Sequence, residues 1–125
     1  MPFTGTDFID LADRLMALAT RGESDERSAI SRAYYGAFLH ARDYVDAEFA
    51  PVTNKPGVHV AVRKQIEPVN QKIAFDLRQL HEWRRMADYD VPHPSGNVAQ
   101  AAVDAIELAR EIVGAVNALP RTASI

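Results

Sequence analysis

The stretch 31-SRAYYGAFLHARDYV-45 decides the fold class of this 125-residue chain. Its apolar residues recur every three or four positions, which is the spacing that places side chains on one side of an α-helix. We therefore predict a long helix over residues 24–49, with Ser24 as its N-cap and acidic residues in its first turn. The expected buried stripe of this helix comprises Ile30, Ala33, Tyr34, Ala37, Phe38, Ala41 and Val45.

Apolar spacing of the same kind runs through most of the chain, and no alternating pattern typical of β-strands competes with it. We predict further helices over residues 7–21, 58–66, 70–89 and about 95–119. Thr6 and Gly22 bound the first of these as its N-cap and its stop. The expected core residues are Phe8, Leu11, Ala12, Leu15 and Ala19 in the first; Ile73, Leu77, Leu80, Arg84 and Ala87 in the helix 70–89; and Val98, Ala102, Ala105, Ile106, Ala109, Ile112, Val113 and Val116 in the last.

Prolines and glycines separate the predicted helices, most clearly in VTNKPG (52–57) and DVPHPSGN (90–97). The length and the 47% hydrophobic composition fit one compact domain with a core of its own. We predict an all-α fold, in which residues 1–125 form a single domain. The domain is an antiparallel bundle of four main helices plus one short helix, with its core at about 7–118 and a loose tail over 119–125.

The absence of cysteine excludes disulfides, thiolate metal sites and a cysteine nucleophile, and it is typical of a reducing compartment. The start, MPFTGTDFIDLADRL, carries acidic residues where a secretory signal carries basic ones, and no apolar run approaches the ~20 residues that span a bilayer. We expect a soluble, cytoplasmic protein with no membrane partner. His59 and His93 lack the i, i+4 spacing of helical metal ligands, so we predict no metal and no cofactor.

The net charge of −3 is unevenly distributed along the chain. Residues 55–85 carry seven Lys or Arg against three acids, whereas residues 1–54 carry five against nine and residues 86–125 carry two against five. Eleven of the fourteen cations are Arg, whose planar fork suits bidentate contact with phosphate. The basic middle segment therefore indicates either a phosphate-binding surface or a solvated helix face.

Two ordered motifs give the sequence a resemblance to a known family. The first is SRAYYGAFLHA (31–41), at the start of the long helix. The second lies in the helix 70–89 and consists of Leu77, Arg78, Arg85, Ala87, Asp88, Tyr89 and Asp90. With these motifs the chain resembles the HEPN superfamily of helical nucleotide-binding domains over roughly residues 7–118, and in particular its small stand-alone prokaryotic members.

The resemblance implies a role in RNA chemistry or in protein pairing. Members of the family often act as ribonucleases, many of them as toxins or antiviral effectors, and many are encoded beside a small nucleotidyltransferase partner. Their active motif is an Arg followed by four to six residues and a His, near the end of the helix that corresponds to 70–89. Metal-free cleavage of RNA needs a base for the 2′-hydroxyl and a cation at the phosphate, tasks that His and Arg fulfil.

This sequence departs from that motif. No His follows Arg84 or Arg85 after four to six residues; Asp90 stands at the correct spacing from Arg85, but an ionised carboxylate is a poor base and repels phosphate. His93 comes after seven residues and lies between two prolines. We predict a degenerate motif without nuclease activity; the alternative is an active site with Arg85 as the phosphate clamp and His93 or His40 as the acid or base.

Other residues of the two motifs are candidates for phosphate binding. The candidate set comprises Arg78, His81, Arg84, Arg85, Ser31, Arg32, Tyr35 and His40, with surface ion pairs and core-edge packing as the alternative interpretation. Trp83 is expected to pack at a helix interface or to stack on a base. Gly36, inside a helix, indicates close helix packing, which a dimer interface would explain.

We accordingly predict an HEPN-like interaction and RNA- or nucleotide-phosphate-binding module of a toxin-antitoxin or defence type pair. Its expected partners are a second copy of the chain, in a homodimer, and a nucleotidyltransferase-like protein. The alternatives are an active metal-independent endoribonuclease toxin and a structural helical adaptor.

Overall fold

The computed structural model describes residues 3–122 and confirms the all-α fold class. The described residues form helices only, joined by turns and loops. The helices are α1 (Gly5–Met16), α2 (Glu23–Glu48), α3 (Val58–Ile66), α4 (Gln71–Tyr89) and α5 (Val98–Asn117). As predicted, α2 and α5 are the longest, with 26 and 20 residues.

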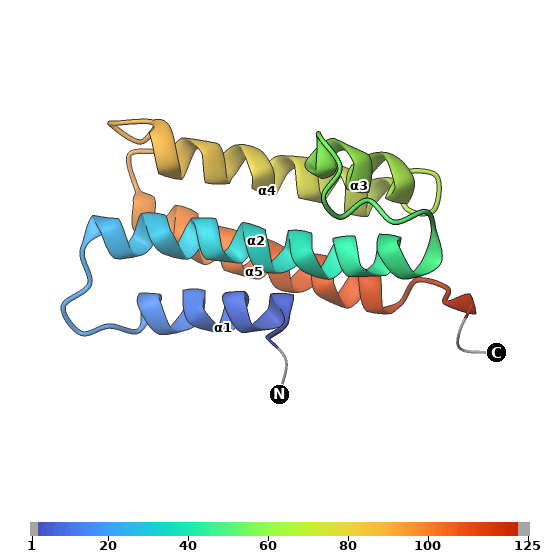
Figure 1. Ribbon diagram of the computed structural model, residues 1–125. Helices are drawn as coiled ribbons and strands as arrows, with labels where there is room; N and C mark the ends of the chain where they lie inside the picture. The colour runs from blue at the N-terminus through green and yellow to red at the C-terminus, as the bar shows by residue number, and fades with distance from the viewer. Residues whose placement is uncertain (1–2, 123–125) are drawn as a thin grey trace.

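The helices lie in three layers around α2 (Figure 1). The α1 helix lies on one side, α2 and α5 occupy the middle, and α4 with the short α3 covers the other side. Successive main helices run antiparallel, as predicted, and α3 lies beside the first part of α4. Because α2 packs against each of the other helices, its side chains reach both outer layers.

The core follows the predicted stripes of α2, α4 and α5. Every expected core residue of α2 is buried, from Ile30 to Val45, and so are Ile73, Leu77, Leu80 and Ala87 of α4. The expected stripe of α5 is buried except for Val113, which is partly exposed. The largest fully buried side chain is Tyr34, so a polar hydroxyl enters the core with its ring and needs a partner there.

The first helix differs from its prediction in both bounds and buried face. It begins after Thr4, not Thr6, because the Asp7 carboxylate accepts a hydrogen bond of 2.7 Å from the Thr4 N–H. It ends at Met16, whose carbonyl accepts from the Arg21 guanidinium, so Ala19 lies outside the helix and is exposed. Of the predicted stripe only Ala12 is fully buried, and it is joined by Gly5 and Ile9, whereas Phe8, Leu11 and Leu15 are partly exposed.

Two other predicted helix signals were wrong. Gly22 is not the stop of α1 but the N-cap of α2, because the Asp25 carboxylate accepts from its N–H at 2.9 Å. Ser24 consequently lies inside the first turn of α2 instead of capping it. The predicted N-caps were wrong because the observed ones, Thr4 and Gly22, each donate their N–H to a carboxylate three residues downstream.

Gly36 does mark a close helix contact, but within the chain. A Cβ atom at this position would lie 2.5 Å from the Cγ1 of Ile9 and 2.6 Å from the carbonyl oxygen of Gly5. Gly5 is equally crowded, because its own Cβ would lie 2.4 Å from the carbonyl oxygen of Gly36. The two glycines therefore allow α1 and α2 to approach closely, and the expected use of Gly36 at a dimer interface was wrong.

The described end of the chain is held against α2. The Tyr44 hydroxyl donates to the Pro120 carbonyl at 2.8 Å, and the Glu48 carboxylate accepts from the Thr122 N–H at 3.1 Å. The predicted loose tail thus has anchored residues up to Thr122; residues 123–125 lie outside the described residues.

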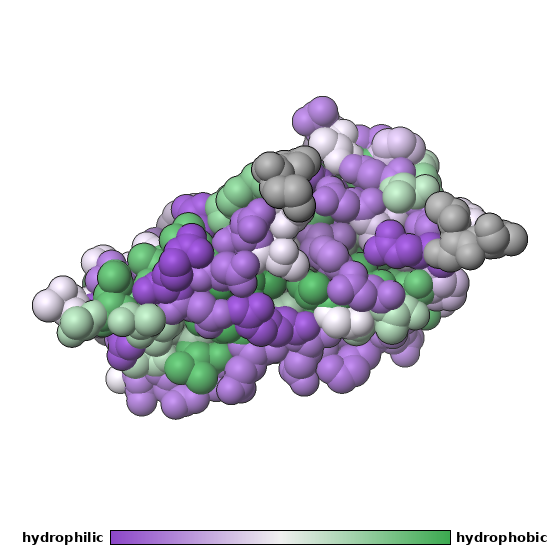
Figure 2. All heavy atoms as spheres, turned by 90° about the horizontal axis from the view of Figure 1, so that it is seen from below, coloured by the Kyte–Doolittle hydropathy of each residue, from purple (hydrophilic) through white to green (hydrophobic). Residues whose placement is uncertain are grey.

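The outer surface of the α1 layer is mainly hydrophilic, with small separate hydrophobic areas (Figure 2). Between residues 3 and 122, no helix combines the length and the apolar character that crossing a membrane requires. Large exposed hydrophobic side chains occur elsewhere, and two of them lie on α4: Phe75, with 67% of its surface exposed, and Tyr89 at the end of the helix, with 72%.

Candidate functional site

Four rings from three helices stack between α2 and the α3–α4 layer. Tyr34 and Phe38 come from α2, His59 from α3 and His81 from α4. The centroid of the His59 ring lies 4.3 Å from that of Phe38 and 4.9 Å from that of His81, and the Tyr34 and His81 centroids are also 4.9 Å apart. The interplanar angles of these pairs are small, so the rings lie face over face. We call these four residues the imidazole–aromatic cluster.

Hydrogen bonds fix both imidazoles of the cluster. The Nη1 of Arg63 lies 3.3 Å from the Nδ1 of His81. A guanidinium has no acceptor, so Nδ1 accepts and the ring proton of His81 is on Nε2. The Tyr34 hydroxyl bonds to the Nδ1 of His59. Burial raises the pKa of Tyr34 above its ordinary value, so the phenol keeps its proton and the hydrogen bond to His59 joins two neutral groups.

The environment keeps both histidines uncharged at neutral pH. Burial, together with the neighbouring His59, Arg63, Arg84 and Arg85, lowers the pKa of His81 to about 4. Burial, Arg84 and Arg63 also lower the pKa of His59. The site is therefore positive through its arginines and presents neutral imidazoles, a combination that an approaching anion would stabilise.

Arg84 connects the cluster with the end of α4. Its guanidinium carbon lies 5.8 Å from the ring centroid of Tyr34 and 5.6 Å from that of Tyr35, in cation–π geometry. Its Nη1 pairs with the Asp88 carboxylate at 3.0 Å. Its buried Nε has no hydrogen-bond partner among the described residues. Arg84 was predicted both as a core-stripe residue and as a phosphate ligand, and the structure places it half-buried beside the cluster.

A cleft of about 480 Å³ opens between α3 and α4, next to the cluster. Its lining residues are Val60, Arg63, Lys64, Glu67, Gln71, Ala74, Phe75 and Arg78. Three of them are cations, and none of the three has a carboxylate within ion-pair distance in the part of the chain that the structure describes. Arg63 lines the cleft and bonds to His81 of the cluster, so the two features adjoin. We call the space lined by these eight residues the α3–α4 cleft.

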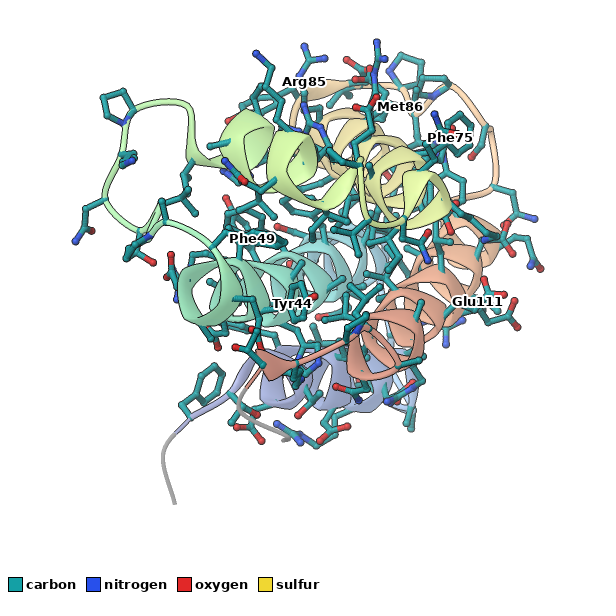
Figure 3. The ribbon with its side chains drawn as sticks, turned by 90° about the vertical axis from the view of Figure 1, so that its right-hand side faces the viewer. Tyr44, Phe49, Phe75, Arg85, Met86 and Glu111 are labelled. Atoms are coloured by element: carbon teal, nitrogen blue, oxygen red, sulfur yellow. The ribbon has the colours of Figure 1, made fainter. Side chains whose placement is uncertain are left out.

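The structure brings part of the predicted candidate set to this site. Arg78 lines the cleft, and His81, Arg84 and Tyr35 lie at the cluster. Arg85 is exposed on the outer side of α4, where its Nη1 pairs with Glu82 at 3.0 Å (Figure 3). Arg85 still contributes to the positive field, because its charge lowers the pKa of His81.

Two predicted candidates point to other helices. The guanidinium of Arg32 lies over the ring of Phe8 on α1, at 5.4 Å from its centroid. The Nε2 of His40 lies 2.7 Å from the Oδ1 of Asn117 on α5. The expectation that they join the phosphate-binding set was wrong, because Arg32 faces α1 and His40 faces α5. Ser31 is buried, with no side-chain hydrogen bond recorded between residues 3 and 122.

The motif residues at the end of α4 form a helix terminus. The Nη1 of Arg27 on α2 donates to the carbonyl oxygens of Ala87 at 2.9 Å and of Asp90 at 2.8 Å. Asp88 pairs with Arg84, and Tyr89 is exposed to solvent. These contacts fix the direction in which the chain leaves α4. A structural role at the helix end is therefore enough to explain why these residues occur in this part of the motif.

His93 lies at a different cavity from the cluster. It lines a space of about 320 Å³ together with Trp83, Met86 and residues at the start of α5. Its Nδ1 accepts from the Ser95 N–H at 3.1 Å. Trp83 packs partly buried against the core, as predicted for a helix interface. His93 therefore belongs to the α4–α5 side, whereas the cleft and cluster lie on the α3 side.

Sequence reasoning missed the contribution of α3. His59, Arg63 and Lys64 were not among the candidates, and Tyr34 was predicted only as a core residue. A signal was available, because His59 and Arg63 are four residues apart and share one face of a helix. This shared face contacts α4 because of the angle at which α3 packs against α4. The sequence does not predict that angle.

Comparisons of the chain with protein-family models, with curated proteins and with solved structures return no match. Any inference about function therefore has to come from the arrangement of the side chains. In the described portion, no three His, Asp or Glu side chains are grouped as metal ligands would be. The α3–α4 cleft and the imidazole–aromatic cluster are features whose positive charge would suit an anionic ligand.

Proposed function

We propose that this protein is an HEPN-like module that binds RNA or nucleotide phosphate groups at the α3–α4 cleft and does not cleave RNA. One observation carries the proposal: three cations, Arg63, Lys64 and Arg78, line one cleft without carboxylate partners among the described residues. Unpaired cations that share a cleft repel one another, and a phosphate between them removes that repulsion.

The chemistry of the cluster suits a phosphate group. Arg63 and Arg84 flank the imidazoles, and a planar guanidinium matches two phosphate oxygens. In His81 the Nδ1 accepts from Arg63, so Nε2 is the nitrogen that bears the proton. The neutral imidazole of His81 can therefore donate a hydrogen bond from Nε2 to a phosphate oxygen.

Binding without cleavage follows from the same groups. A general base must be close to the 2′-hydroxyl and have a pKa near the working pH. The pKa of His81 is about 4 and its Nδ1 is occupied by Arg63, so it is a weak base at neutral pH. His93 lines the cavity on the α5 side, and Arg85 pairs with Glu82. These different neighbours support binding without cleavage.

The cellular context of the proposal comes from the resemblance of the two motifs. A small HEPN-like chain of this kind would act in the cytoplasm as a homodimer, in a toxin-antitoxin or defence type pair with a nucleotidyltransferase-like partner. Light scattering tests the dimer: the expected mass is twice the 13.8 kDa of the chain, and a monomer at micromolar concentration contradicts it.

Fluorescence anisotropy with a labelled RNA oligonucleotide tests the binding site. Arg63→Ala and Arg78→Ala should each weaken binding about tenfold, the effect of losing one charged hydrogen bond. Arg14→Ala is the matched control, because Arg14 is exposed on α1, the outer layer opposite α3 and α4. An equal loss of RNA affinity in all three variants would indicate nonspecific charge attraction. It would contradict a binding site at the cleft.

A further inference from the structure

Phe75 is the exposed aromatic residue of the cleft. It lies on the outer side of α4, the side away from α1, and 67% of its surface is exposed (Figure 3). No aromatic ring in the described range packs against it. Val60, which is 44% exposed, lines the same cleft from α3. A single exposed apolar side chain needs no explanation, but an aromatic ring that shares a cleft with unpaired cations has a specific chemistry.

A cation follows Phe75 on the same face of α4. Arg78 is three residues further on, one turn along the helix. Arg85, ten residues on, shares this face but pairs there with Glu82, so Arg78 is the cation that α4 contributes to the cleft. Arg63 and Lys64 line the opposite wall, on α3. The positive charge is thus arranged as a track with an aromatic platform at one end.

A track of cations beside an exposed ring selects a polymer with both phosphates and free base faces. Proteins that bind single-stranded nucleic acid combine a positive groove with aromatic rings on which bases stack. In a duplex the base faces are stacked on each other and cannot reach such a ring. We propose that the α3–α4 cleft binds single-stranded RNA, with one unpaired base stacked on Phe75 and the adjoining phosphates on Arg63, Lys64 and Arg78. This inference rests on the proposed function and names its ligand class.

The remaining lining groups fit a nucleotide. A volume of about 480 Å³ is within the ~300–1,000 Å³ of pockets that hold small ligands. Gln71 offers both an amide donor and a carbonyl acceptor to a base edge. Glu67 is the one acidic lining residue; it accepts from base amino groups or ribose hydroxyls and repels phosphate from its end of the cleft.

A protein partner is the rival occupant, because aromatic residues and Arg are also common at protein interfaces. The charges favour RNA. Three cations against one carboxylate match a polyanion, whereas a protein surface would have to supply several acids at fixed positions.

The test compares a labelled twelve-nucleotide single strand with the blunt duplex of the same sequence by fluorescence anisotropy. Wild type should bind the single strand more tightly than the duplex. Phe75→Ala should weaken single-strand binding about tenfold, since base stacking on an aromatic ring is lost. Duplex binding should stay unchanged, and Phe75→Tyr should restore the single-strand affinity. Leu18→Ala is the control, because Leu18 is also exposed but lies in the loop after α1.

The outcomes separate this inference from the function on which it rests. If Arg63→Ala weakens binding and Phe75→Ala does not, phosphate binding stands and base stacking is overturned. If the duplex binds as tightly as the single strand, the inference is overturned as well. If no RNA binds, both proposals fail. If Phe75→Ala leaves RNA binding intact but dissociates a dimer in light scattering, Phe75 belongs to a protein interface instead.

Discussion

The guanidinium of Arg63 donates to the Nδ1 of His81 across 3.3 Å, and this contact joins α3 to the middle of α4. Because Arg63 also lines the α3–α4 cleft, one side chain connects the stacked imidazoles with the cations at the surface. The contact sets the tautomer of His81 and helps to keep the ring uncharged. An anion in the cleft would therefore act on the cluster through Arg63.

The lowered pKa values of His59 and His81 predict that stability decreases in mild acid. An unfolded histidine binds a proton near pH 6.5, whereas folded His81 does so only near pH 4. Between these values the unfolded state binds more protons, so the free energy of unfolding should fall as the pH is lowered from about 6.5 towards 4. Urea unfolding across this range measures the effect.

His81→Phe is the matching variant, because it keeps a stacked ring and removes the titrating group. Its unfolding free energy should depend less steeply on pH than that of the wild type over the same window. Carboxylates that titrate in this range are common to both proteins, so the difference between the two curves reports on His81. Identical curves would show that His81 is not kept neutral by its surroundings.

The close contact between Gly5 and Gly36 predicts that side chains larger than glycine at these positions destabilise the packing of α1 against α2. Gly36→Ala places a methyl group 2.5 Å from a side-chain carbon of Ile9, so we expect it to lower the unfolding free energy by about 1–3 kcal/mol. Gly114→Ala in α5 meets no atom within 4 Å and should be neutral or stabilising by up to about 1 kcal/mol. Denaturant unfolding of both variants measures the contrast, and a tolerated Gly36→Ala would mean that the helices separate easily.

The capping of α4 by Arg27 predicts a second stability effect. Arg27→Ala removes donors to the carbonyls of Ala87 and Asp90, and we expect it to cost about 1.5–3 kcal/mol, the value for hydrogen bonds to a charged group. Arg14→Ala, on an exposed face of α1, should change the unfolding free energy by less than about 0.5 kcal/mol. Thermal unfolding followed by circular dichroism compares the two, and equal melting temperatures would rule out the cap.

The separation of His93 from the cluster predicts an absence of metal-independent cleavage. Wild-type protein incubated with mixed RNA in EDTA should leave the RNA intact, because no histidine of suitable pKa adjoins the cations. Analysis of the products gives a clear alternative. Fragments ending in 2′,3′-cyclic phosphate, and lost in both Arg85→Ala and His93→Ala, would establish a nuclease.

The helical architecture could be predicted because its signal is local. In α2 the apolar spacing is regular over some four turns, and every residue of the predicted stripe is buried. In α1 the spacing was ambiguous, and two contacts decided the outcome: Asp7 moves the start to Thr4, and Arg21 binds the Met16 carbonyl at the end. A hydrogen bond from one side chain to a helix end does not change the spacing of the apolar residues. The spacing therefore cannot predict where such a helix begins or ends.

The candidate site could be predicted only in part, because it depends on how three helices meet. Arg78, His81 and Arg84 lie on one helix and were found from their spacing. His59 and Arg63 joined them only through the crossing of α3 over α4, and a short helix after a proline-rich connector gives no sign of its crossing angle. The candidates on the second helix divided for the same reason: Tyr35 faces Arg84, whereas His40 faces Asn117.

The salt dependence of RNA binding tests the central claim most directly. Each phosphate contact on a single strand contributes about 0.7 to the slope of log K against log salt concentration. The double variant Arg63→Ala/Arg78→Ala should therefore lower the magnitude of the slope by about 1.4, while Arg14→Ala leaves it at the wild-type value. A slope that is the same in all three proteins would contradict a phosphate-binding site at the α3–α4 cleft.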